Sequence, residues 1–106
     1  MFKYILHGRD PVPCDDIIAW GRFFEKVGNR IVARTQVGAV SEVSTVFLGM
    51  DHNFGGGPPV LFETMVFGGP MEGEQERYHT WEQAEEGHAW MVARVTAAHV
   101  AAGLTS

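Results

Sequence analysis

The chain has 106 residues, of which 45% are hydrophobic and 20% charged; this balance excludes a disordered chain, and the length predicts a single domain over residues 1–106, which the order of its predicted elements assigns to the α+β class. Eight basic residues against thirteen acidic ones give a net charge of −5, which argues against a nucleic-acid or anionic-membrane surface. The only cysteine, Cys14, excludes an internal disulfide, and no apolar run suits a signal peptide or a membrane helix, so we expect a cytoplasmic protein.

The first part of the chain predicts a strand, a helix and a second strand. Residues 2–7 (FKYILH) favour a strand, and two prolines within residues 8–14 favour a turn. Asp15 or Asp16 can cap a helix, which Gly28 and Asn29 would end. The apolar positions of that helix recur at steps of three and four: Ile17, Trp20, Phe24 and Val27. Residues 30–37 (RIVARTQV) alternate in part and predict a strand.

The second part predicts a hairpin and a long helix. Two strand-like runs, residues 43–50 and 59–68, flank FGGGPP and indicate a β-hairpin with a longer loop; residues 68–76 indicate an exposed connection. Thr80 and Gln83 fit a capping box that opens the last helix, and Gly103 can end it. Its apolar stripe comprises Trp81, Ala84, His88, Met91, Val95, Ala98 and Ala102. The order β-α-β-β-β-α predicts an antiparallel sheet with two helices packed on one face.

Polar residues in or beside these apolar runs define a candidate site. His88 lies on the stripe of the last helix, Glu63 lies within a strand, and Asp51 and His52 stand at the mouth of the hairpin. Two histidines and a carboxylate (His52, Glu63 and His88) would suit zinc or another divalent metal, and with Asp51 they would equally suit general acid-base catalysis. In the alternative interpretation, His88 is a core histidine bonded to Glu63 or to a backbone carbonyl.

Other features predict simpler roles. FGGGPP lacks the Lys-Ser/Thr of a phosphate loop, so we interpret it as a flexible hairpin loop. Arg34 and Arg77 are expected to form surface ion pairs. Trp90 falls off the apolar stripe beside Gly87, whose position within a helix is consistent with the close approach of another backbone. These two residues predict a homodimer.

The runs VSTVFLGMDHNFGGGPPVLFETMVFGGP and RYHTWEQAEEGH resemble a family of small uncharacterised proteins of bacteriophages and prophages, over roughly residues 30 to 95. The resemblance implies action inside a bacterial host and carries no catalytic residue across. It departs from that family at His79, where a small hydroxyl residue is expected. The β-α-β-β-β order is also similar in topology to the vicinal-oxygen-chelate module, in which strand-borne His and Glu bind a metal.

Two functional hypotheses follow. In the first, the protein is a dimeric phage-type accessory protein, a binding module for an unknown protein or small-molecule ligand. In the second, it is a small metal-dependent enzyme of the hydrolase type that uses His52, Glu63 and His88, with Asp51 or His7 in support. The second requires Glu63 and His88 to lie on the same side of the sheet.

Overall fold

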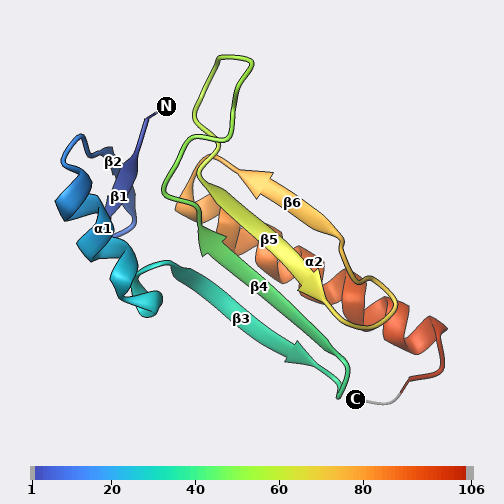
Figure 1. The fold of residues 1–106 in the computed structure, drawn as a ribbon. Coiled ribbons are helices and arrows are strands. Elements are labelled where there is room, and N and C mark those ends of the chain that lie inside the picture. Colours follow the sequence, from blue (N-terminus) through green and yellow to red (C-terminus); the bar gives the residue numbers. More distant parts are fainter. Residues whose placement is uncertain (1, 105–106) are drawn as a thin grey trace.

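The computed structural model describes residues 2–104 and has the predicted α+β architecture (Figure 1). In chain order its elements are β1 (Tyr4–His7), β2 (Asp10–Pro13), α1 (Ile17–Glu25), a 3-10 turn (Val27–Asn29), β3 (Ile31–Val37), β4 (Ser41–Phe47), β5 (Phe62–Phe67), β6 (Gln75–Tyr78) and α2 (Trp81–Ala101).

Strands β3 to β6 form one antiparallel sheet in sequence order, and α2 packs along one face of it (Figure 1). Alternate residues of β4 are buried, from Ser41 to Phe47, because successive side chains of a strand point to opposite faces. Strand β5 has the same pattern, with Phe62, Thr64 and Val66 buried. The buried positions of β4 and β5 pair with one another and face α2. The predicted antiparallel sheet and hairpin are therefore confirmed.

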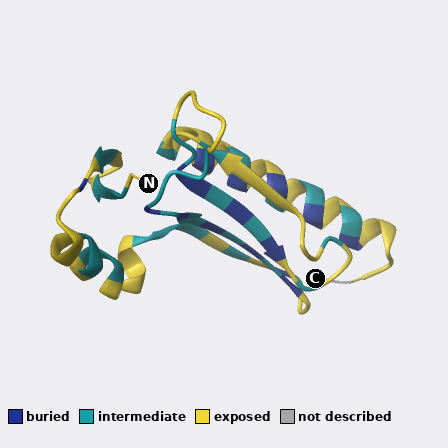
Figure 2. Ribbon diagram, turned by 45° about the horizontal axis from the view of Figure 1, so that its top comes forward, coloured by how far each residue is buried: buried dark blue, intermediate teal, exposed yellow. Residues whose placement is uncertain are grey.

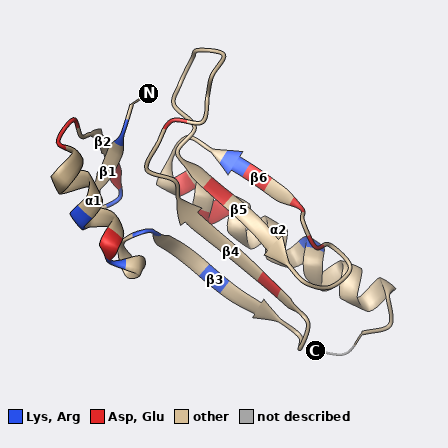
Figure 3. Cartoon of the chain, viewed as in Figure 1, with Lys and Arg blue, Asp and Glu red and all other residues tan. Residues whose placement is uncertain are grey.

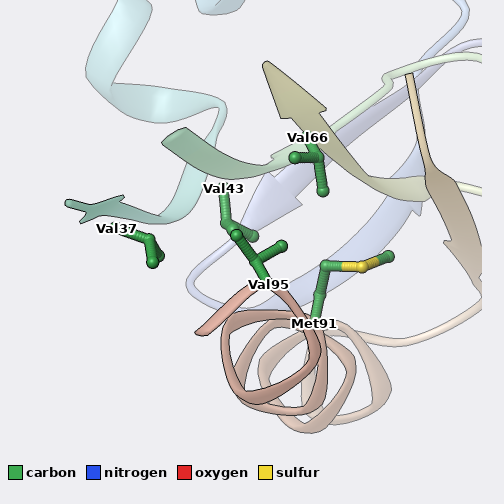
Figure 4. Packing of buried hydrophobic residues seen from close by; sticks show 5 residues of the cluster. All are labelled: Val37, Val43, Val66, Met91 and Val95. Carbon is green, nitrogen blue, oxygen red and sulfur yellow. The ribbon is translucent and has the colours of Figure 1, made fainter. Parts of the chain in front are cut away.

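The apolar core lies between this face and α2. Figure 4 shows one half of it, in which Met91 and Val95 of α2 meet Val43 and Val66 of the sheet, beside Val37. The other half comprises Phe47, Leu61, Phe62 and Ala84. Burial of one such large side chain contributes about 1.5–3 kcal/mol, so these contacts fix the position of α2. The predicted stripe is right from Ala84 to Val95, but it continues through His99, which is 3% exposed.

The N-terminal unit departs most from the prediction. Strand β1 does not join the main sheet; it forms a separate hairpin with β2. The backbone N–H of Tyr4 and the indole N–H of Trp20 both donate to the carbonyl of Gly49, at 2.8 and 3.1 Å. Helix α1 reaches the core cluster through Phe23 and Phe24, whose rings lie 6.0 and 6.3 Å from that of Phe47. Because β1 lies outside the sheet, the topological likeness to the vicinal-oxygen-chelate module does not hold.

Both helix starts match their predicted caps. A carboxylate oxygen of Asp16 accepts from the N–H groups of Ile18 and Ala19, at 3.0 and 3.2 Å. The hydroxyl of Thr80 accepts from the Gln83 N–H at 3.1 Å, while the Gln83 side chain accepts from the His79 N–H rather than from that of Thr80. Gln75 and Glu76, predicted to lie in an exposed connection, instead belong to the edge strand β6.

Candidate functional site

The structure separates the residues of the predicted metal site. Glu63 stands between the buried Phe62 and Thr64, so its side chain lies on the sheet face opposite α2. There it accepts a hydrogen bond at 2.9 Å from Arg77 of β6. His88, a residue of α2, is buried between α2 and the opposite face of the sheet. No cluster of three metal-ligating side chains occurs within residues 2–104. The site expected from His52, Glu63 and His88 is therefore not assembled, because strand parity places its carboxylate on the wrong face.

His88 instead belongs to a buried chain of hydroxyl groups. Its Nδ1 lies 2.7 Å from the hydroxyl of Thr45, and its Nε2 lies 2.8 Å from that of Thr35. The Thr45 and Thr64 hydroxyls are 2.5 Å apart, and Tyr78 donates to Thr64 at 3.1 Å. Each of the four strands and α2 thus contributes one polar group. This series of hydrogen bonds fixes both the position of α2 on the sheet and the register of the strands, because a register shift of one residue would break every bond in it.

The direction of these bonds defines the state of His88. Tyr78 donates to Thr64, so full pairing requires Thr64 to donate to Thr45 and Thr45 to donate to His88 Nδ1. The imidazole is then neutral, with its proton on Nε2 directed at Thr35. Burial lowers the pKa of His88 below its ordinary 6.5. The core-histidine interpretation is right about burial, but the partners are threonines rather than Glu63 or a carbonyl.

A second histidine, His99, makes a similar contact near the other end of α2. Its Nε2 lies 2.7 Å from the Ser41 hydroxyl, which itself donates to the carbonyl of Gly68 at 2.9 Å. Since the single hydroxyl proton of Ser41 goes to that carbonyl, His99 must be the donor in the first bond. An imidazole that donates to a serine cannot remove its proton, and His99 Nδ1 has no partner within residues 2–104. Ser41 and His99 are therefore a structural pair and not a nucleophile with its base.

Asp51 organises the loop between β4 and β5. One oxygen of its carboxylate accepts from the N–H groups of Asn53 and Val60, at 2.8 and 2.9 Å. These two backbone hydrogen bonds lower the pKa of Asp51. His52 points a ring nitrogen at the carbonyl of Met50, 2.8 Å away. Both residues thus have structural partners within the loop, which explains their place at the mouth of the hairpin.

The tip of this loop projects from the molecule (Figure 1). Phe54 is 79% exposed, and the glycines after it allow the chain to turn: Gly56 and Gly57 have φ values of 86° and 89°. Phe54 borders a shallow hollow of about 530 Å³ together with Phe2 and Asn53. The glycine and proline tract is therefore a hairpin loop, as predicted.

The face of the sheet opposite α2 is the larger exposed feature. No helix of the described chain, residues 2–104, covers it (Figure 1). An open sheet face normally carries polar side chains, but four apolar ones stand here: Ile31, Val46, Met65 and Phe67. Phe67 is 50% exposed. Two ion pairs stand beside the apolar residues: Arg34–Glu42 at 3.1 Å and Arg77–Glu63 at 2.9 Å. Arg34 and Arg77 thus form the surface ion pairs predicted for them. Figure 3 shows both signs of charge across the strands.

A groove of about 400 Å³ runs over β3 and β4 on this open face. Its walls are Val27, Arg30, Ile31, Arg34, Glu42, Ser44, Val46 and Phe67. Arg30 lies with its guanidinium 5.2 Å from the Phe24 ring, and its buried Nε has no hydrogen-bond partner within residues 2–104. The groove is therefore apolar along its floor and cationic at the end nearest α1.

The two residues that predicted a homodimer have partners in their own chain. A Cβ atom at Gly87 would overlap the ring and hydroxyl of Tyr78, so this glycine makes room for Tyr78 and not for a second backbone. Trp90 is 56% exposed, and the Arg94 guanidinium lies 4.6 Å from its ring. Any dimer must therefore be argued from another surface.

No family model, no curated protein and no solved structure matches the chain. Within residues 2–104, no helix is long and apolar enough to cross a membrane.

Proposed function

We propose that the protein acts by binding rather than by catalysis, as a phage-type accessory protein that works in the bacterial cytoplasm. Its binding surface is the open face of the sheet. The observation that carries this proposal is the presence of four apolar side chains, Ile31, Val46, Met65 and Phe67, at outward positions of β3, β4 and β5; Phe67 is exposed and the other three are partly buried.

The placement of the histidines supports the same conclusion. His88 and His99 are buried; both ring nitrogens of His88 lie at threonine hydroxyls, and Nε2 of His99 lies at the serine hydroxyl. Glu63, the one carboxylate that could have activated either of them, is held by Arg77 on the other face. By contrast, apolar side chains interspersed with ion pairs on an exposed sheet face are compatible with a protein interaction site. The resemblance of residues 30 to 95 to phage-encoded proteins suggests the setting in which such a module would act.

Photo-crosslinking in living bacteria tests this proposal. A photoreactive phenylalanine analogue would replace Ser44, in the middle of the open face, and in a matched control it would replace Ala93, on the outer side of α2. We expect discrete crosslinked species from position 44 and only diffuse background from position 93. Equal background from both positions would refute the open face as a binding surface.

A further inference from the structure

Helix α1 contacts its own chain on one side only, and its first turn is exposed. None of its nine described residues is buried, and Figure 2 shows only exposed and intermediate colours along it. Trp20 and Phe24 hold it to its own chain, through the bond to Gly49 and the contact with Phe47. At the first turn, Ile17 and Ile18 are 63% and 65% exposed. Two adjacent isoleucines in water are an unfavourable arrangement that contact with another surface would relieve.

The chemistry of this first turn complements that of the groove. The turn combines the two isoleucines with the carboxylates of Asp15 and Asp16. The groove combines the apolar side chains of Ile31, Val46 and Phe67 with the guanidinium groups of Arg30 and Arg34. Arg34 already pairs with Glu42, whereas Arg30 forms no ion pair within residues 2–104. Apolar groups would therefore meet apolar groups, and the Asp15 carboxylate would meet Arg30, since Asp16 caps α1 and Arg34 is paired with Glu42, which also lines the groove.

We infer that the groove on the open sheet face receives the first turn of α1 from a second copy of this chain, and that the two copies exchange these helices in a symmetric dimer. This inference rests on the proposed function and names the partner of that same surface. A two-fold arrangement uses each contact twice, since each copy has both a groove and a helix.

The shape of the single chain agrees with such an exchange. Its radius of gyration is 15.2 Å, with extents of 49 × 29 × 19 Å. A compact chain of this length has a radius of about 13 Å. The difference arises because the N-terminal unit stands beside the sheet instead of over it (Figure 1). A second copy would cover the open face of the sheet, and its groove would bind the first turn of α1.

The first test is sedimentation of the full chain and two variants with one added charge each. Ile18→Asp places the charge on the exposed first turn of α1, and Val100→Asp places it at the equally exposed end of α2. We expect the wild type and Val100→Asp to be dimers, with dimerisation weakened at least tenfold in Ile18→Asp. A wild-type monomer, or an Ile18→Asp variant that dimerises like Val100→Asp, would overturn the inference.

The second test identifies which surfaces meet. In a Cys14→Ala background, Ile18→Cys and Ser44→Cys proteins would be oxidised separately and as a mixture. We expect a disulfide-linked species of twice the 11.7 kDa chain mass only in the mixture. Crosslinking of Ser44→Cys alone would indicate two sheets packed face to face, which would overturn the helix exchange.

The two tests separate this inference from the proposed function. A monomer whose position 44 still crosslinks to another protein in cells would refute the dimer and leave the open face as the binding surface. A monomer with only background crosslinking from position 44 would refute both.

Discussion

Replacement of Thr45 by valine tests the role of the buried hydroxyl chain most sharply. Valine has nearly the same shape as threonine, so the change removes a hydroxyl and leaves little cavity. His88 Nδ1 would lose the hydroxyl 2.7 Å away, and the Thr64 hydroxyl would lose its neighbour at 2.5 Å. Each buried polar group left without a partner costs about 1–3 kcal/mol, and the added methyl group returns about 0.8 kcal/mol. Two such groups give about 2–6 kcal/mol before the methyl contribution, so we expect a net loss of about 1–5 kcal/mol.

Urea denaturation followed by circular dichroism measures this loss. For a domain of this size, 1 kcal/mol corresponds to roughly 4–8 °C in Tm, so a fall of at least about 4 °C in thermal unfolding should accompany it. Thr96→Val is the matched control, because the Thr96 hydroxyl is exposed and bonds only the carbonyl of Val92; its effect should stay within about 0.5 kcal/mol. If Thr45→Val is no less stable than Thr96→Val, the hydroxyl chain does not hold the core.

Three further predictions concern other parts of the fold. Burial lowers the pKa of His88 in the folded state, so the unfolded chain binds the proton first, and the free energy of unfolding should fall as the pH drops below about 6.5. Between about pH 7.5 and about pH 5.5, the His88→Leu variant should therefore lose less stability than the wild type. Equal losses would contradict this prediction. Gly87→Ala should destabilise the protein by about 1–3 kcal/mol in thermal unfolding, although alanine favours a helix, because its Cβ would displace Tyr78; it should instead stabilise a Tyr78→Ala background. Asp51→Ala should speed hydrogen exchange at the Asn53 and Val60 amides about tenfold or more, with Asp51→Asn in between; unchanged exchange would show that the carboxylate does not clamp the loop.

Periodicity alone located most of the fold. The stripe of the last helix was predicted because Ala84, His88, Met91 and Val95 recur at helical spacing and do face the core. His99 was missed because the predicted stripe continued from Val95 through Ala98, three residues on, whereas the buried position is His99, four residues on. The prediction also missed β6, since Gln75–Tyr78 is an edge strand whose residues are mostly exposed and polar.

The candidate site could not be predicted because it depends on strand parity. In β5 both faces carry apolar residues, so nothing local shows whether Phe62 or Glu63 points at α2. The partners of His88 were missed for a related reason: Thr35, Thr45 and Thr64 resemble ordinary β-branched strand residues until the register brings them together. Likewise, the hairpin β1–β2 depends on Gly8 turning the chain at a φ of 62°, which detaches β1 from the main sheet.

The most direct measurement of the central claim is how well the open face is covered in the cell. Ser44→Cys and Ala93→Cys, each in the Cys14→Ala background, would be alkylated in intact bacteria and as dilute purified protein. If the open face is a binding surface, the thiol at position 44 should react more slowly in cells than in dilute solution, by about tenfold or more, while the thiol at position 93 reacts alike in both. Equal rates for position 44 in cells and in dilute solution would contradict the account.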